Sequence, residues 1–305
     1  MKDFSPAYGI MPPLLTPFNE DKSIDFDTYE RLIEWHIERR VHSLFVVCGS
    51  SEYFALTEDE AIKMAETAVK AAGDRIYIVA GSTIHDNVED NIAMTKRMGD
   101  TGVAGCFITT PRDIPAEDEP MLEYFLAIHD AVDCPVYAYE MPGGTNYKFS
   151  PEAFAEIGKR ERFIGIKDTT CDVDIVKAKI EAAKGTIKII DANTPNLFQT
   201  LQLGATGGIN TSANVCPSLF SKMYRLIQDG DLETAGKLHQ RIVEIDSMMW
   251  GYVMSAKMAV SMMGLPQLKH VMRNPSREFT PERMQGVKDM VAEVEKAEKE
   301  FDAYN

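Results

Sequence analysis

The chain alternates short apolar runs with longer amphipathic segments. Eight runs have a near-continuous apolar character, and they lie at 9–18, 43–49, 75–82, 105–111, 134–142, 163–169, 186–193 and 205–212. Such runs, without strict polar alternation, are typical of parallel strands that are covered on both faces. The segments between them have helical spacing, and two begin with local start signals. Thr57 with Glu60 fits a capping box, and Ser150 followed by Pro151 fits an N-cap with proline at the first helical position.

Eight strand–helix units predict a closed (β/α)8 barrel, the TIM barrel, over residues 1–225, where it carries the active site. An open doubly wound sheet is the alternative architecture. It would usually show a glycine-rich phosphate-binding turn after its first strand, and no G-x-G-x-x-G or Walker A sequence occurs in the chain. From 226 to 305 the pattern is helical only, with a helix start expected at Thr280 and Pro281. We therefore expect C-terminal helices packed on the barrel.

The charge balance restricts the partners of this protein. Acidic residues number 47 against 32 basic ones, which gives a net charge of −15. Nucleic acids and anionic membrane surfaces need a basic footprint, so neither is expected as a partner. The N-terminus lacks the pattern of a signal peptide, and no apolar run is long enough to span a bilayer. A cytoplasmic location is the expectation.

Metal and disulfide chemistry find little support in the sequence. The five cysteines are scattered, and no C-x-x-C pair occurs among them. The six histidines show no H-x-H or H-E-x-x-H spacing, which disfavours a metal-dependent aldolase. His42 and His85, near strand ends, are interpreted as capping or core histidines.

One lysine stands where a buried strand ends. The stretch FIGIKDTT, at 163–170, places Lys167 after an apolar run, and the fifth run places Tyr139 in the same position. Active sites of such barrels collect at the C-terminal ends of the strands. An amine held away from water loses its proton more readily, attacks a ketone and forms a Schiff base, and a nearby tyrosine can move the protons. The alternative is a structural lysine paired with Asp168 or Asp191, and local sequence does not decide between the two.

Four motifs in barrel order carry a resemblance to a known family. They are PPLLTPFNEDKSID at 12–25, YEMPGGT at 139–145, GIKDTT at 165–170 and LGATGGINTSANVCP at 203–217. Together they resemble the dihydrodipicolinate synthase/N-acetylneuraminate lyase family of pyruvate-type class I aldolases. The resemblance implies a Schiff base between Lys167 and pyruvate or another 2-keto acid, with Tyr139 as the proton shuttle.

The resemblance also implies the rest of the site. A loop after the second strand would hold the substrate carboxylate, which makes Gly49, Ser50 and Ser51 the candidates. Gly208 and Ile209 would line the pocket beside the substrate. No metal and no organic cofactor would be needed, and the family implies a homotetramer or homodimer. The reaction expected is cleavage or formation of a C–C bond next to a 2-keto acid, on a sugar-acid-like substrate.

Three departures from the family pattern narrow this expectation. The carboxylate loop reads Cys48-Gly49-Ser50-Ser51-Glu52 instead of glycine, two hydroxyl residues, glycine and glutamate. The strand-four segment TTPRDIP lacks the tyrosines that synthases present there, and Gly144 stands where synthases place an arginine. Dihydrodipicolinate synthase activity itself is therefore not expected. Arg112, in the strand-four segment, is either a ligand for a distal carboxylate or hydroxyl of the substrate, or a solvated loop charge.

Two other functions remain open. A sugar-acid dehydratase would use the same imine to expel water, and a catalytically silent relative would only sense a keto acid. Two further residues are interpreted as structural. Glu140 should face the helix layer because neighbouring strand residues point to opposite sides, and Lys257 should reach a rim or subunit contact from its methionine-rich helix.

Overall fold

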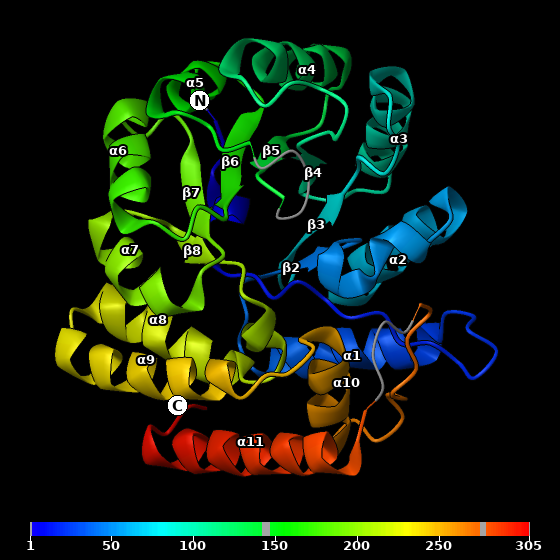
Figure 1. The fold of residues 1–305 in the computed structure, drawn as a ribbon, viewed down its shortest axis with the longest axis vertical. Helices are drawn as coiled ribbons and strands as arrows, with labels where there is room; N and C mark the ends of the chain where they lie inside the picture. Colours follow the sequence, from blue (N-terminus) through cyan, green and yellow to red (C-terminus); the bar gives the residue numbers. More distant parts are fainter. Residues whose placement is uncertain (1, 142–146, 275–278, 305) are drawn as a thin grey trace.

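Eight parallel strands form a single sheet that closes on itself. The computed structural model describes residues 2–141, 147–274 and 279–304. The strand order is β1-β8-β7-β6-β5-β4-β3-β2, and helices surround the strands (Figure 1). The strands are β1 (Gly9–Ile10), β2 (Ser43–Val46), β3 (Tyr77–Gly81), β4 (Gly105–Thr109), β5 (Val136–Tyr139), β6 (Phe163–Asp168), β7 (Lys188–Asp191) and β8 (Gly207–Gly208).

The chain just after β1 closes the barrel against β2. The amide of Leu14 donates to the carbonyl of Phe45 at 2.8 Å, and the amide of Phe45 donates to the carbonyl of Pro12 at 3.0 Å. The predicted (β/α)8 barrel is thereby confirmed. Each strand lies inside its predicted run but is shorter than that run. In the first run, Pro12 and Pro13 have no amide hydrogen to donate, so the regular ladder stops after Ile10.

Helices follow the strands around the barrel. They are α1 (Phe26–Glu38), α2 (Glu58–Ala72), α3 (Val88–Asp100), α4 (Asp118–Ala131), α5 (Pro151–Gly158), α6 (Val173–Ala183), α7 (Leu197–Leu203) and α8 (Pro217–Asp229). The predicted start signals are confirmed. Thr57 and Glu60 form a capping box at α2, and the hydroxyl of Ser150 accepts the amide of Ala153 at the start of α5.

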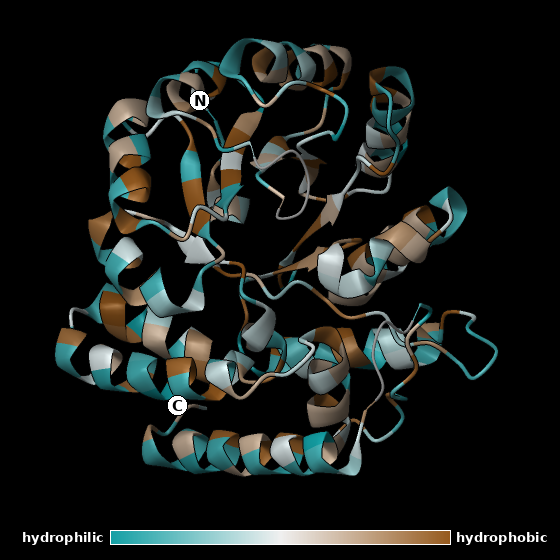
Figure 2. Ribbon diagram, in the orientation of Figure 1, coloured by the Kyte–Doolittle hydropathy of each residue, from teal (hydrophilic) through white to brown (hydrophobic). Residues whose placement is uncertain are grey.

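Three more helices cover one side of the barrel. They are α9 (Leu232–Ser247), α10 (Val253–Met262) and α11 (Pro281–Glu300). Figure 1 shows α11 running beside α9 and α10, at the edge of the molecule away from the strands. Thr280 caps α11, as its sequence predicts, and the buried positions of this helix are all apolar, namely Val287, Met290, Val291, Val294 and Ala297. In Figure 2 most of the α11 ribbon is hydrophilic, with a few hydrophobic turns, whereas β6 and β7 carry hydrophobic segments.

The barrel interior is packed with aromatic side chains. The ring of Tyr137 on β5 stacks on Phe107 of β4 with 4.4 Å between centroids. Gly165 on β6 makes room for the same ring, because a Cβ there would lie 2.7 Å from a ring carbon of Tyr137. No helix in the described part of the chain is long and apolar enough to cross a membrane.

Candidate active site

Lys167 and Tyr139 meet at the C-terminal ends of neighbouring strands. They are register partners on β6 and β5, so their side chains point the same way into the barrel mouth. The amine nitrogen of Lys167 lies 3.2 Å from the hydroxyl oxygen of Tyr139. Both side chains are buried, with 7% of Lys167 and 6% of Tyr139 exposed. The structure thus brings together the two residues that the motifs single out.

The surroundings of the amine are aromatic. Its nitrogen lies 4.3 Å from the ring centroid of Tyr139 and 5.6 Å from that of Phe45, which projects from β2. Among the described residues Lys167 forms no ion pair. Asp168 instead accepts from Lys179 at 2.8 Å, and Asp191 accepts the hydroxyl of Thr200 at 2.6 Å. The alternative of a lysine paired with Asp168 or Asp191 does not describe this site.

A cavity of about 490 Å³ opens in front of the amine. Lys167, Tyr139 and Ile209 lie in its wall. The other residues of the lining are mostly polar and uncharged, and they are Thr169, Cys171, Ala192, Asn193, Thr194, Pro195, Thr211, Asp246 and Tyr252. Hydroxyl and amide groups can donate or accept hydrogen bonds, so this wall suits a substrate that carries several hydroxyl groups.

The loop after β2 contains the predicted carboxylate ligands in a single turn of 3-10 helix, η2 (Gly49–Ser51). The turn follows Val47, whose φ of 53° is unusual for a buried β-branched residue. Gly81 on β3 permits this geometry, since a Cβ there would meet the carbonyl oxygen of Val47 at 2.1 Å. Such backbone strain is often found at ligand-binding loops.

The two serines of this turn differ in their contacts. The hydroxyl of Ser51 donates to the carbonyl of Leu14 at 2.7 Å, and the carbonyl of Ser51 accepts from Thr16 at 2.7 Å. Ser51 is therefore engaged in holding the loop against the segment after β1. The hydroxyl of Ser50 has no hydrogen-bond partner among the described residues, although 93% of the residue is covered, leaving 7% exposed. Ser50 is the hydroxyl that remains available to a ligand.

Electrostatics connect this loop with the lysine. Burial raises the pKa of the Cys48 thiol, and its hydrogen bond with the Ser51 hydroxyl and the charge of Lys167 act in the opposite direction. Lys167 is thus close enough to the loop after β2 for its charge to lower the pKa of Cys48. Gly49 faces open space, because a Cβ added there would meet no atom within 4 Å. None of the three loop residues lies in the wall of the cavity itself.

Two other predicted residues do not appear in the lining of this cavity. The guanidinium of Arg112 lies 5.2 Å from the ring centroid of Phe54, and it lines a smaller pocket together with Tyr53 and Thr109. Gly208 contributes no side chain, and a Cβ there would meet the side chain of Asn210 at 2.6 Å. Both assignments stay predictions. Gly144, which replaces the arginine of synthases, lies outside the described residues.

Glu140 has the orientation that the sequence indicates, whereas Lys257 is structural but does not reach the rim that was expected for it. Glu140 is fully buried on the helix side of β5, where its carboxylate accepts from Lys179 of α6 at 2.6 Å. Lys257 is also fully buried, and its amine donates to Glu52 at 2.6 Å and to the carbonyl of Val271 at 2.8 Å. Lys257 thus holds the loop after β2 through Glu52, although it lies 205 residues away in the sequence.

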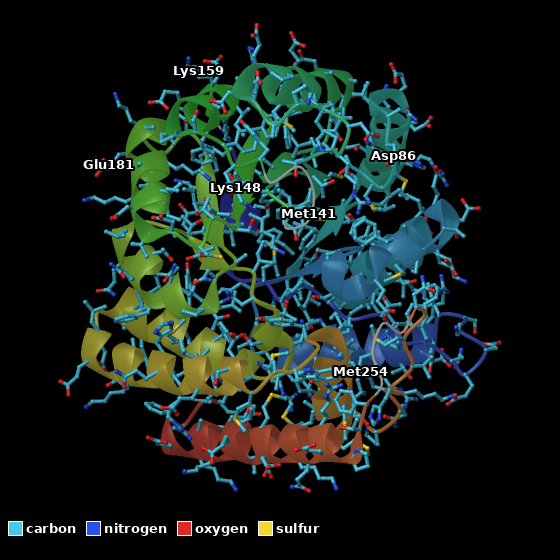
Figure 3. The ribbon with its side chains drawn as sticks, viewed as in Figure 1. Asp86, Met141, Lys148, Lys159, Glu181 and Met254 are labelled. Atoms are coloured by element: carbon cyan, nitrogen blue, oxygen red, sulfur yellow. The ribbon has the colours of Figure 1, made fainter. Side chains whose placement is uncertain are left out.

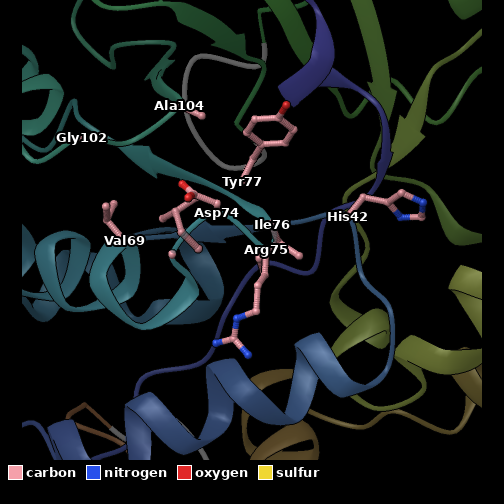
Figure 4. A pocket seen from close by; sticks show the side chains of 10 residues that line it. His42, Val69, Asp74, Arg75, Ile76, Tyr77, Gly102 and Ala104 are labelled. Atoms are coloured by element: carbon pink, nitrogen blue, oxygen red, sulfur yellow. The ribbon is translucent and has the colours of Figure 1, made fainter.

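A second cavity, of about 510 Å³, lies at the opposite end of the barrel. Its lining includes His42 just before β2, Tyr77 at the start of β3 and Ala104 just before β4 (Figure 4). Arg75 in the same wall is already paired with Glu34 at 2.8 Å. None of the predicted site residues lies there. Within the described ranges, no three histidine, cysteine, aspartate or glutamate side chains are grouped as metal ligands.

Sequence reasoning missed most of the cavity wall. Thr169, Asn193 and Thr211 follow β6, β7 and β8, so their position after a strand was the signal that could have found them. Asp246 and Tyr252 come from α9 and the turn before α10. Nothing in the local sequence marks these two. Tyr252 has a φ of 36°, a strained value for a tyrosine, and stands exposed at the rim.

Comparison with known proteins extends over nearly the whole chain. The model of the dihydrodipicolinate synthetase family matches residues 6–294. The chain belongs to this family. As a member it is a lyase, and the family resemblance that its four motifs carry is confirmed. A curated relative, the 4-hydroxy-tetrahydrodipicolinate synthase of Thermodesulfovibrio yellowstonii, is 30% identical over 289 residues, which cover 94% of this chain and 96% of the relative.

Other members of the family give similar matches. An uncharacterized DapA-like lyase of Thermofilum pendens is 26% identical, with 94% of this chain and 96% of the relative covered. The structure of dihydrodipicolinate synthase from Acinetobacter baumannii complexed with pyruvate superposes with a TM-score of 0.88 at 25% identity, covering 95% and 99% of the two chains. YagE of E. coli K12, in complex with pyruvate, also gives 0.88 at 25% identity, covering 94% of this chain and 98% of YagE.

Proposed function

We propose that this protein is a Schiff-base class I aldolase that cleaves or forms a C–C bond next to pyruvate or another 2-keto acid. The observation that carries the proposal is the buried amine of Lys167, 3.2 Å from the hydroxyl of Tyr139 and open to a cavity. Two family structures that contain pyruvate, at 25% identity, support a 2-keto acid as the substrate.

The chemistry follows from these two groups. The neutral amine of Lys167 adds to the C2 carbonyl of the keto acid and gives a carbinolamine. Tyr139 donates a proton to the carbinolamine hydroxyl. This hydroxyl then leaves as water, and a protonated imine forms. The imine withdraws electrons from C2, so C3 can lose a proton or break its bond to C4. The enamine that results takes up a proton at C3, or attacks an aldehyde in the reverse direction.

The cavity wall supports a hydroxylated second substrate. Thr169, Asn193 and Thr211 offer neutral hydrogen-bonding groups, and the carboxylate of Asp246 can accept from hydroxyls. Among the described residues of this lining, Lys167 is the one lysine or arginine, and the imine forms on it. We therefore propose a sugar-acid-like substrate. Relatives bear the name 4-hydroxy-tetrahydrodipicolinate synthase, so the exclusion of that activity is not supported. This activity should be tested alongside sugar-acid cleavage.

A sugar-acid dehydratase is the second candidate function, since the same imine lets C3 lose a proton and C4 then lose its hydroxyl, which together leave as water. Product analysis separates the two. Pyruvate and an aldehyde mark an aldolase, whereas loss of water without C–C cleavage marks a dehydratase. A keto-acid sensor would bind the ligand and give neither product, and its binding would survive Lys167→Ala.

The test is to trap the imine. The protein is incubated with pyruvate and borohydride, and its peptides are mapped by mass spectrometry. We expect a reduced adduct on Lys167. In parallel, deuterium exchange into the methyl group of pyruvate, followed by proton NMR, measures passage through the enamine without any need for the second substrate. An adduct on Lys257 instead, or neither an adduct nor exchange, would overturn the proposal.

A further inference from the structure

Three fully buried charged residues lie directly behind the candidate active site. They are Glu140 at the end of β5, Asp168 at the end of β6 and Lys179 on α6, and each side chain is 0% exposed. The amine of Lys179 lies 2.6 Å from a carboxylate oxygen of Glu140 and 2.8 Å from one of Asp168. Glu140 directly follows Tyr139 in the chain, and Asp168 directly follows Lys167.

A buried group of charges is not by itself evidence of stabilisation. Removing charges from water costs several kcal/mol per ion, and well-packed apolar residues of the same volume often stabilise a fold equally well. Here one lysine is shared by two carboxylates, and the charge of the nearby Lys148 also favours the carboxylate of Glu140. The amine of Lys148 donates to Thr169 at 2.6 Å and lies 3.4 Å from the carbonyl of Glu140. In Figure 3, Lys148 lies toward the middle of the ring of helices, whereas Lys159 and Glu181 lie at its outer edge.

The carboxylates also bind the segments that follow the strands. Glu140 accepts the amide of Phe149 at 2.8 Å and that of Thr169 at 3.4 Å. Asp168 accepts the amide of Thr170 at 2.9 Å and its hydroxyl at 2.6 Å. The network therefore connects β5, β6 and α6 with the segments that follow β5 and β6 in the chain. The two ion pairs of Lys179 lie on the helix side of the sheet, whereas Thr169 also lines the cavity in front of Lys167.

This arrangement bears on the residues inside the barrel. Successive side chains of a strand point to opposite faces, so a constraint on residue 140 or 168 outside also constrains residue 139 or 167 inside. Proton transfer between carbinolamine and tyrosine depends steeply on separation. A displacement of about 1 Å can lower a rate by about two orders of magnitude.

We propose that Glu140, Asp168 and Lys179 form a positioning network that sets the separation of the Tyr139 hydroxyl from the Lys167 amine. This inference rests on the proposed function. The three residues touch neither substrate nor reacting atoms, and they act through the strand ends. A merely structural network would change the stability of the protein and leave the kinetic constants of the folded enzyme as they are.

The test compares three variants with the parent in the pyruvate exchange reaction. Glu140→Met removes the link to β5 and leaves Lys179 with Asp168 as a balanced pair. Glu140→Gln keeps one oxygen that can still accept from Lys179 and Phe149. Lys177→Met is the matched control, since Lys177 lies on the same helix with its side chain 55% exposed and 3.9 Å from Glu181. The maximal exchange rate, the KM for pyruvate and the unfolding midpoint are measured for each.

We expect Glu140→Met to lower the maximal exchange rate about 30-fold, and Glu140→Gln about threefold, with KM changed less than about threefold in both. The control should equal the parent. A folded Glu140→Met protein with parental rate would overturn the positioning role and leave the proposed function intact. If Glu140→Met does not fold, parental rate in Glu140→Gln overturns the role instead. A parent that shows neither adduct nor exchange would overturn the proposed function itself.

Discussion

The amine of Lys167 and the hydroxyl of Tyr139 lie 3.2 Å apart, on side chains that are paired in register across β5 and β6. Tyr139 also lies edge-on to Phe45 and to Phe107, with ring centroids at 6.2 Å and 6.4 Å. The phenol ring is therefore held by packing, while its hydroxyl faces the amine. This geometry supports the role proposed for Tyr139 in the proton transfers of imine formation.

Replacing Tyr139 by phenylalanine should separate proton transfer from binding. Tyr139→Phe removes only the hydroxyl, so the aromatic packing remains. General acid–base groups contribute about 100-fold or more to rate, and we expect a loss of about that size in the maximal exchange rate, with little change in KM for pyruvate. Borohydride should still trap an adduct on Lys167, more slowly. Tyr77→Phe, at the opposite end of the barrel, is the control, and an equal loss there would contradict this assignment.

The two serines of η2 should differ in what they affect. Ser50→Ala should raise KM for pyruvate about tenfold and leave the maximal rate within about threefold, because one hydrogen bond to a charged group is lost. Ser51→Ala should leave KM unchanged and lower the free energy of unfolding by about 1–2 kcal/mol, since the carbonyl of Leu14 loses its donor. Exchange kinetics and urea denaturation of both variants check the assignment. The reverse pattern would mean that Ser51 binds the substrate.

The fold and the central pair were predictable because they depend on local signals. Near-continuous apolar runs identify parallel strands, and a residue at the end of such a run lies at the barrel mouth. The pairing of Lys167 with Asp168 could have been dismissed on the same grounds, because adjacent strand residues face opposite sides. The true partner of Asp168 is Lys179, one helix later.

Other parts of the site depend on contacts across long stretches of chain. Glu52 follows the carboxylate loop, and its partner Lys257 lies 205 residues away. Asp246 and Tyr252 reach the cavity only because α9 and α10 fold back onto the barrel. Periodicity, capping and strand ends carry no information on such packing. The sequence thus predicted the meeting of Lys167 and Tyr139 better than the walls of the cavity around them.

Replacing Lys257, the buried partner of Glu52, should destabilise the protein and leave Lys167 as the lysine that forms the imine. Desolvation lowers the pKa of Lys257, and Glu52 opposes this effect. Lys257→Met would leave the carboxylate of Glu52, 8% exposed, with the amide of Arg273 as its remaining donor among the described residues. Loss of one member of a buried pair typically costs about 3 kcal/mol or more.

Urea denaturation measures this effect, with Lys237→Met as the control. Lys237 pairs with Glu233 at 2.7 Å on the exposed face of α9, and such a pair contributes at most about 1 kcal/mol. Borohydride trapping in Lys257→Met should still place the adduct on Lys167. An adduct lost in a variant that remains folded would give Lys257 a part in the chemistry.

Asp191, at the end of β7, should make stability depend on pH in the weakly acidic range. Burial raises its pKa from 3.8 to about 6, despite hydrogen bonds from Thr200 and Asn193 that favour the carboxylate, and the charge of Asp168 adds to the rise. Between pH 4 and 6 the unfolded chain has lost this proton and the folded chain has kept it. Stability from this group therefore falls as the pH rises through that window, and it is constant above the folded pKa.

Asp191→Asn removes the titration and retains the shape of the side chain. A shift of this size corresponds to a change on the order of 3 kcal/mol across the window. We expect the free energy of unfolding of the parent, relative to Asp191→Asn, to fall between pH 4 and pH 6 and to level off near pH 7. Other carboxylates titrate alike in both proteins, so the difference between the two curves isolates Asp191. A difference that is flat with pH, or that rises with it, would show that the folded protein holds Asp191 as a carboxylate throughout, and that the hydrogen bonds at this strand end outweigh its burial.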